Sequence, residues 1–410
     1  MHICFAPFAA ALLVTCAPVG PPASLPGGAA SVSGEGGSLA ELHGRHRVAG
    51  LESRRFTHAQ LWAVLGPIVD RSAASQREEI GRSAEGRPLY LVRYGNGPVP
   101  VLLWSQMHGD ESTATMALAD VLNMLGSVDD ERSRQLADRL TVWMVPMLNP
   151  DGAERFQRRN AQGIDINRDA RTLATPEGRA LRELHRRLRP AFGFNLHDQN
   201  VRTPVGSSDR IAAIALLAPP FDEARSDNKV RLRAARVAAT IRHAVEPLVG
   251  GHIARYDDSY GPRAFGDAMQ RWGTSTVLIE SGAWRDDPEK QYLRQVNSVA
   301  LVAALDAIAT GAYAGVDPSG YRGLPFNGRS VNDLVVRGGT VVAPGLAPFA
   351  ADLAIDYADL LHRVGGRIID VGDLADTRAR DTLGVAGLYL HFTAAADTRN
   401  EAGAVEPLTP

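Results

Sequence analysis

Between residues 100 and 310 the sequence alternates short apolar runs with longer amphipathic stretches. The apolar runs predict strands at residues 100–106, 140–147, 192–196 and 275–279, and the longer stretches predict helices at 112–125, 176–188, 229–245 and 288–310. Short apolar strands that alternate with helices are typical of a sheet covered on both faces. We therefore expect an α/β fold with a mixed, largely parallel sheet flanked by helices on both faces.

The composition changes toward both ends of the chain. An apolar segment around Cys4 and Cys16 precedes residues 18–37, which are rich in Pro, Gly, Ala and Ser and suit a tether. Near residue 316 the Pro/Gly-rich run DPSGYRGLPFNGR leads into short strand-like runs with glycine turns. The sequence thus predicts a signal segment and tether at 1–42, a main domain at 43–315 and a small β-rich domain at 316–410.

The apolar segment at the start resembles a secretory signal, so we expect an exported protein, periplasmic or secreted. The run Leu13-Val14-Thr15-Cys16 resembles a bacterial lipoprotein signal, which makes Cys16 a candidate lipid anchor, although Thr15 departs from that pattern. Removal of the segment leaves one cysteine or none, and therefore no disulfide. No apolar run approaches 20 residues, so no transmembrane helix is expected.

The charge balance excludes one class of partner. The chain carries 44 Lys and Arg against 46 Asp and Glu, a formal net charge of -2. It therefore has no excess of cations to neutralise phosphates, and nucleic-acid binding is not expected.

Two polar side chains follow the first predicted strand. His108 and Glu111 stand three positions apart with Gly109 between them, where the chain turns. Strand ends are where open α/β sheets place ligands, and such a pair can contribute two ligands to a zinc ion. The same spacing recurs at His243 and Glu246 within an Ala/Arg-rich stretch, where it predicts only a solvated helix face.

A second motif follows the predicted strand at 140–147. It contains Asn149-Pro150-Asp151-Gly152, Arg158 and the run Gly163-Ile164-Asp165-Ile166-Asn167-Arg168. Together with His108 and Glu111, these elements resemble the zinc carboxypeptidase family, of the carboxypeptidase A type. The resemblance runs in order from about residue 80 to 284 and implies that 43–315 is a zinc carboxypeptidase-like catalytic domain.

The resemblance implies a metal site and a general base. His197 in AFGFNLHDQN is the implied third ligand, so that His108, Glu111 and His197 hold one zinc ion per chain with its fourth position open to water, the ligand set of carboxypeptidase A. Asp165 would orient the ring of His108. Glu280 in TSTVLIESG would take the proton of metal-activated water and pass it to the leaving amine.

The resemblance also implies how substrate is held. Arg158 would stabilise the oxyanion, although Arg159 beside it leaves the register open by one residue. Asn167 and Arg168 would bind a free C-terminal carboxylate, which a guanidinium can grip with two hydrogen bonds. Tyr260 is the candidate for the tyrosine that closes over substrate, with Tyr256 as the alternative.

These residues imply a metallocarboxypeptidase that hydrolyses the C-terminal peptide bond of peptides. Three alternatives remain open: a zinc-dependent deacylase of N-acyl amino acids, similar to succinylglutamate desuccinylase and aspartoacylase, a murein-peptide amidase, and a binding module that has lost catalysis. The residues Asp151-Gly152 after Asn149-Pro150 favour the carboxypeptidase. The preferred terminal side chain is not defined, but Arg263, Asp267 and Trp272 are candidates for the pocket wall.

Overall fold

The computed structural model describes residues 39–127, 131–359 and 363–392. The predicted signal segment and Cys16 lie outside these residues. Two compact units divide the described chain: one holds 39–332 with 378–380, and the other holds 333–377 with 381–392. Residues 316–332 thus pack with the larger unit, while the assignment of separate functional domains stays a prediction.

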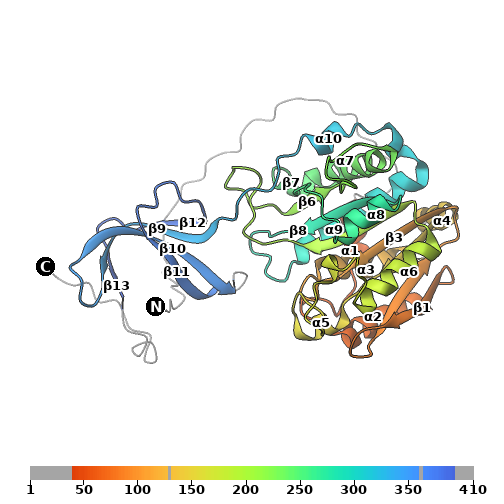
Figure 1. The fold of residues 1–410 in the computed structure, drawn as a ribbon, viewed down its shortest axis with the longest axis horizontal. Coiled ribbons are helices and arrows are strands. Elements are labelled where there is room, and N and C mark those ends of the chain that lie inside the picture. Colours follow the sequence, from red (N-terminus) through yellow and green to blue (C-terminus); the bar gives the residue numbers. More distant parts are fainter. Residues whose placement is uncertain (1–38, 128–130, 360–362, 393–410) are drawn as a thin grey trace. The chain divides into compact units, whose positions relative to one another are not determined.

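The larger unit is built on an eight-stranded sheet with the order β1-β2-β4-β3-β5-β8-β6-β7 (Figure 1). Its four central strands, β4, β3, β5 and β8, run parallel. On one side β1 pairs antiparallel with β2 and β2 with β4, and on the other β6 pairs antiparallel with β8 and parallel with β7. This confirms the α/β fold with a mixed, largely parallel sheet. The strands are β1 (Ser75–Arg82), β2 (Pro88–Tyr94), β3 (Val99–Ser105), β4 (Leu140–Val145), β5 (Phe192–Asp198), β6 (Ile214–Leu217), β7 (Ile253–Arg255) and β8 (Ser275–Ser281).

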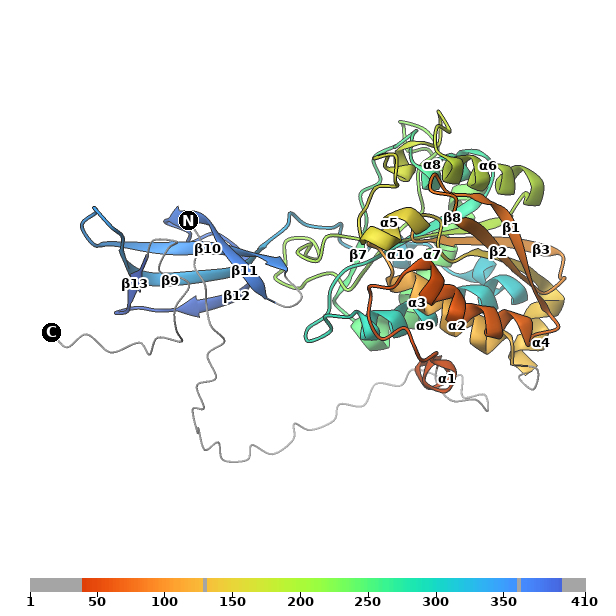
Figure 2. The same cartoon turned by 90° about the horizontal axis from the view of Figure 1, so that it is seen from below.

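Helices cover both faces of this sheet, with α6 and α8 on one side and α2, α3 and α9 on the other (Figure 2). Thr57 caps α2 through the backbone N–H of Gln60, as a helix start requires. The helices are α1 (Leu39–His46), α2 (His58–Asp70), α3 (Thr113–Leu125), α4 (Glu131–Arg139), α5 (Pro150–Arg155), α6 (Pro176–Leu188), α7 (Lys229–Val249), α8 (Phe265–Arg271), α9 (Gln291–Thr310) and α10 (Ser319–Arg322), with the 3-10 turns η1 (Ile166–Arg168) and η2 (Ala312–Gly315).

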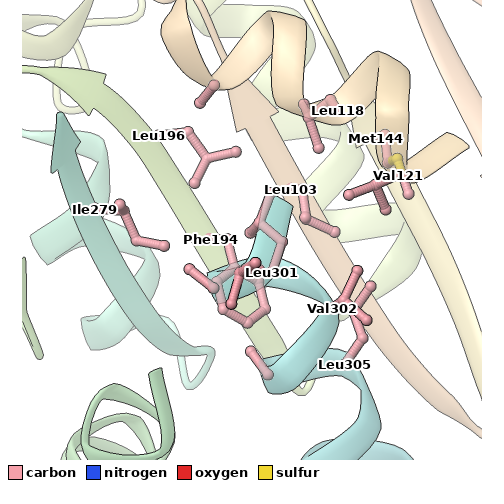
Figure 3. Packing of buried hydrophobic residues seen from close by; sticks show 14 of the residues in the cluster. Leu103, Leu118, Val121, Met144, Phe194, Leu196, Ile279, Leu301, Val302 and Leu305 are labelled. Carbon is pink, nitrogen blue, oxygen red and sulfur yellow. The ribbon is translucent and has the colours of Figure 1, made fainter. Parts of the chain in front are cut away.

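Alternate residues of the central strands supply two separate apolar cores. Leu103, Phe194 and Ile279 pack with Leu118 of α3 and Leu301 of α9 (Figure 3). The neighbouring strand positions face the other way, where residues such as Leu102 and Trp104 pack against α6 and α8. Burial on both faces fixes the register of each strand, so the side chains at the strand ends also have fixed directions.

The four predicted strands and four predicted helices are all present, with ends that differ by a few residues. Helix α7 runs on to Val249 because Pro247 is accommodated in its last turn, and α9 begins at Gln291 rather than at residue 288. Among the elements that the sequence did not predict are α4, α8, β6 and β7. These elements are short, and α4 has only two buried residues, so their apolar periodicity is weak.

The smaller unit is a five-stranded sheet, which confirms the predicted β-rich region. Within this sheet the strands lie side by side in the order β11, β10, β9, β12. Strand β13 pairs in parallel with β9. Val336, Val341, Leu353 and Ile355 form its core. The bounds are β9 (Asn332–Val342), β10 (Phe349–Asp359), β11 (Val364–Gly372), β12 (Ala379–Gly384) and β13 (Tyr389–His391).

The membrane prediction can be checked for the part of the chain that the structure describes. Within it, no helix combines the length and the apolar character needed to cross a bilayer.

A buried ion pair ties the N-terminal segment to the α/β core. Arg294 of α9 donates to both carboxylate oxygens of Asp120 in α3, at 2.7 and 2.5 Å, and also to the carbonyls of Val48 and Leu51. The side chains are 0% and 2% exposed. A buried charge is tolerated only with such partners, so the pair fixes how residues 48–51 pass over α3 and α9.

We predict that Arg294→Met destabilises the fold by about 3–5 kcal/mol, because the buried Asp120 carboxylate loses the guanidinium and keeps only His43 and the backbone N–H of Val48 as partners. The free energy of unfolding, measured by urea titration with circular dichroism, tests this. Glu183→Gln is the control: Glu183 pairs with Arg186 on the surface, where such pairs contribute at most about 1 kcal/mol. A loss below about 1 kcal/mol for Arg294→Met would contradict the assigned role.

Candidate active site

The loop after β3 places His108 and Glu111 at the carboxyl ends of the parallel strands. In this loop the backbone of Gly109 packs closely against α5. A Cβ atom on Gly109 would lie 2.0 Å from the carbonyl carbon of Gly152 in α5. Only glycine fits at such a backbone approach. The spacing of His108-Gly109-x-Glu111 therefore depends on the α5 turn that packs against it.

The Asn-Pro-Asp-Gly motif holds that turn in place rather than taking part in chemistry. Asn149 caps α5 by accepting from the backbone N–H of Gly152 at 2.8 Å, and Pro150 is the first helical residue. Asp151 is fully buried and accepts hydrogen bonds from Ser83 Oγ, from the backbone N–H of Glu85 and from Arg87. The motif thus links α5 to the β1–β2 turn and supports the loop that carries His108.

Two more functional side chains come from the ends of adjacent parallel strands. His197 lies near the end of β5, and Glu280 lies opposite it on β8. Both side chains are buried, with 2% and 7% exposure. The parallel register alone sets these two residues side by side, because each is the same distance from the strand end.

His108, Glu111 and His197 form a compact set of ligand atoms. Nδ1 of His108 lies 3.2 Å from Nδ1 of His197. The Glu111 carboxylate lies 2.8 Å from the first nitrogen and 2.7 Å from the second. Among the described residues this is the group of three His, Cys, Asp or Glu side chains close enough to hold one metal ion.

This donor set fits zinc. Two imidazole nitrogens bound tetrahedrally to one zinc ion at ordinary bond lengths stand about 3.3 Å apart, close to the separation found here. Three protein ligands also match the open type of zinc site, in which a fourth position serves the reaction. Two ring nitrogens and a carboxylate that converge in a buried space require a cation or a proton between them.

The pKa values of the ligand side chains also indicate that a positive charge is needed between them. Burial opposes protonation of His108, but the charge of Glu111 and the hydrogen bonds with Asp165 and Glu111 outweigh it and raise the pKa of His108 to about 9. Burial would likewise raise the pKa of Glu111, but His108 and His197 hold it well below the ordinary value. The carboxylate is therefore ionised, as a metal ligand must be.

Asp165 orients His108 from the other side of the ring. Nε2 of His108 lies 3.0 Å from Asp165 Oδ1, which leaves Nδ1 directed toward Glu111 and His197. Asp165 also accepts from the backbone N–H of Asn167 and so caps the 3-10 turn η1. Burial would raise the pKa of Asp165. The hydrogen bonds with His108 and Arg158 and the charges of these two residues outweigh that effect and hold the pKa below its ordinary value.

Glu280 has the properties of a carboxyl group that exchanges protons. Burial and the nearby negative charge of Glu111 raise the pKa of Glu280 well above its ordinary value. In turn, the charge of Glu280 is the main cause that raises the pKa of Tyr256, which lines the same cleft. A buried carboxyl group with a raised pKa is suited to general acid–base work.

The structure distinguishes Arg158 from its neighbour Arg159. Arg158 donates to both Asp165 and Glu111, and its Nη1 lies 3.1 Å from Nδ1 of His108. Its side chain is 44% exposed, so the guanidinium also faces the cleft. Arg159 instead donates to the carbonyl of Gly163 and does not line the cleft. Of the two arginines, Arg158 alone is placed to meet a substrate oxygen.

The predicted substrate-binding residues line the same cleft, whose volume is about 790 Å³. Asn167 is fixed by accepting from the backbone N–H of Phe265 at 2.9 Å, and Arg168 is exposed, with one hydrogen bond to the carbonyl of Asn167. Tyr260 and Tyr256 both line the cleft, so its geometry leaves the choice between them open. The cleft therefore presents cations next to the buried ligand set.

Two of the three candidates for the pocket wall, Arg263 and Asp267, line the cleft. The prediction for Trp272 was wrong. It lies just past the end of α8, where its ring packs against Arg182 and His185, away from the ligand set.

The second His-x-x-Glu pair behaves as the sequence indicates. His243 is exposed on α7, and Glu246 pairs with Arg242 one turn away at 3.0 Å. Within the described residues no third metal ligand accompanies this pair, which lies on a solvated helix face.

Sequence reasoning missed several polar residues that line the cleft. Asn195 lies two positions before His197 on the same face of β5, is 2% exposed and has an unpaired side-chain oxygen among the described residues. Asn327 donates to Gln199 at 2.7 Å, although it lies in the stretch assigned by sequence to the β-rich domain. The strand period could have indicated Asn195, but no local signal indicates Asn327, which a long-range pairing of Phe326 with Arg255 brings in.

Comparison with known proteins agrees with this geometry. Residues 70–241 match the model of the zinc carboxypeptidase family, and this span contains all three ligands, Asp165 and Arg168. The match covers less than half of the chain, so it is a similarity to that family over residues 70–241.

Among curated relatives, mouse carboxypeptidase D is 29% identical over 202 residues, which are 36% of this chain and 15% of that protein. Carboxypeptidase E of Caenorhabditis elegans is 32% identical over 134 residues, 27% of this chain and 28% of the relative. The chain therefore spans less than a third of the length of either relative.

Solved structures share the fold. A metallo-carboxypeptidase from Burkholderia cenocepacia aligns with a TM-score of 0.51 and 18% identity, covering 64% of this chain and 71% of the other. Bovine thrombin-activatable fibrinolysis inhibitor, in complex with tick carboxypeptidase inhibitor, also gives a TM-score of 0.51 at 18% identity, covering 64% of this chain and 98% of that one.

We predict that Gly109→Ala lowers the free energy of unfolding by about 2–3 kcal/mol, because the added methyl group meets backbone rather than a flexible side chain. It also weakens zinc binding, since the loop that spaces His108 and Glu111 must move. Thermal unfolding and chelator competition measure the two effects. Gly315→Ala is the control, because nothing lies within 4 Å of its Cβ position. Wild-type stability and zinc affinity in Gly109→Ala would show that the close approach is not required.

Proposed function

We propose that this protein is a zinc-dependent exopeptidase that hydrolyses the C-terminal peptide bond of peptides. The observation that carries the proposal is the convergence of His108, Glu111 and His197 with Glu280 and an exposed Arg168 in one cleft. The carboxypeptidase relatives support the same class of reaction.

One zinc ion per chain would be held by the two imidazoles and the Glu111 carboxylate. When bound, it supplies Lewis-acid chemistry, which polarises a carbonyl and acidifies water. Glu280 accepts the proton of the attacking water and then donates a proton to the departing amine. Its burial suits both steps, because a raised pKa brings the carboxyl closer to neutral pH.

Cations define which end of a peptide enters the cleft. Arg158 lies beside the ligand set, where it stabilises the oxyanion that forms on the scissile carbonyl. Asn167 and Arg168 bind the terminal carboxylate of the substrate, and Tyr260 covers it, with Tyr256 as the alternative. A free carboxylate next to Arg168 makes the last peptide bond the one that is presented.

The other activities considered from the sequence, a deacylase of N-acyl amino acids and a murein-peptide amidase, are not favoured, since the relatives are carboxypeptidases. The intact ligand set and Glu280 also disfavour an inactive binding module.

Export to the periplasm or by secretion, with Cys16 as a candidate for lipid attachment, belongs to the same proposal. It is supported by the apolar segment that contains Cys16.

We predict that Glu280→Gln retains zinc but lowers kcat by about 10²–10⁴-fold, because proton transfer is lost while the ligands stay in place. Release of the terminal amino acid from blocked dipeptides, with zinc content measured in parallel, tests this. Glu246→Gln, in the surface copy of the motif, should leave both quantities unchanged. Substantial turnover by the Glu280 variant would show that another group is the base.

We predict that Arg168→Ala lowers kcat/KM for peptides with a free C-terminus by about 10- to 100-fold, the loss of one or two charge-assisted hydrogen bonds. Peptides with a C-terminal amide should be poor substrates of the wild-type enzyme for the same reason. Arg171→Ala is the matched control, since Arg171 is exposed in the same loop but does not line the cleft. Equal cleavage of acid and amide peptides would contradict recognition by Arg168.

A further inference from the structure

Behind the ligand set, the buried Lys290 connects three segments of the active site. Its ammonium donates to Oδ2 of Asp198 at 2.9 Å and to the carbonyl of Ser281 at 3.5 Å. The same Asp198 oxygen accepts from Thr113 Oγ1 at 2.7 Å. One cation thereby joins the end of β5, the end of β8 and the first residue of α3.

Each of these three segments carries a residue of the proposed site. Asp198 directly follows His197, and Ser281 directly follows Glu280. Thr113, the first residue of α3, stands two residues after Glu111. In addition, the backbone N–H of Asp198 donates to Oε2 of Glu111 at 3.2 Å. A shift of Lys290 or Asp198 would therefore reach two ligands and the general base together.

Lys290 is placed at some energetic cost, which sets it apart from an ordinary surface lysine. Its side chain is 1% exposed, and that of Asp198 is 5% exposed. At the N-cap of α9 the backbone of Lys290 is left-handed, with φ 52°. Residues other than glycine rarely adopt this conformation. Oδ1 of Asp198 has no hydrogen-bond partner among the described residues, so the ammonium is the charge that compensates this carboxylate.

We infer that Lys290, acting through Asp198, is a positioning residue that holds Glu111, His197 and Glu280 in the geometry needed to bind zinc and exchange protons. The inference rests on the proposed function for its catalytic part, but its effect on zinc affinity stands without it. Supporting partners of metal ligands commonly change metal affinity or activity by about 10- to 100-fold when they are removed.

The test is Lys290→Met, which keeps the length of the side chain and removes the charge. We expect zinc affinity, measured by chelator competition, to fall about tenfold. At saturating zinc, kcat falls by a similar factor while KM changes less than twofold, because the substrate-binding residues lie elsewhere. Arg294→Met is the matched control: it also breaks a buried pair, with Asp120, but the side-chain hydrogen bonds of Arg294 go to Asp120, Gln291 and the carbonyls of Val48 and Leu51. This control should lose stability yet keep the zinc affinity of the folded protein within twofold of wild type.

The double variant Lys290→Met/Asp198→Asn covers the case in which the single variant does not fold, since it leaves no unpaired buried charge. It should fold and still bind zinc at least fivefold more weakly than wild type. Wild-type zinc affinity in a folded Lys290 variant would overturn the inference and reduce the pair to a structural role. If wild-type protein binds zinc but hydrolyses no peptide, the proposed function fails while the affinity comparison still decides the role of Lys290.

Discussion

The parallel pairing of β3, β5 and β8 is the constraint on which the rest of the site depends. Apolar side chains on both faces of these strands fix their register, and the register sets His197 of β5 beside Glu280 of β8. The loop after β3 then needs only one turn to add His108 and Glu111. A buried set of like and unlike charges is costly unless its members are held against one another, and here they are attached to buried central strands.

Much of this arrangement could be predicted from the sequence, because the strong signals are local. Apolar runs of strand length identify β3, β4, β5 and β8, and the polar end of the first of them indicates His108 and Glu111. His197 and Glu280 are indicated by the family resemblance. The Asn149-to-Gly152 motif and the run to Arg168 make the family recognisable. The structure adds the reason for the first of these motifs, which is to buttress the loop that carries His108 through Gly152 and Asp151.

What the sequence could not supply is contact between distant segments. Trp272 looked available for the pocket wall, but the direction of α8 turns it toward Arg182. Asn327 reaches the cleft through a pairing of Phe326 with Arg255 that no periodicity announces. Lys290 stands alone before an apolar helix, and only the folded chain shows its ammonium against Asp198. Tyr256 and Tyr260 share the cleft, and their spacing in the sequence does not separate their roles.

The central claim is that two imidazoles and one carboxylate of this chain hold a single zinc ion. X-ray absorption at the zinc edge, combined with metal analysis of the purified protein, tests it most directly. The account predicts about one zinc ion per chain, with imidazole scattering from two histidines, nitrogen and oxygen donors at roughly 2.0–2.2 Å and no sulfur neighbour. In His197→Ala the same measurement should show the loss of one imidazole or of the metal itself. A protein without stoichiometric zinc, or one whose zinc environment is unchanged in His197→Ala, would contradict the claim.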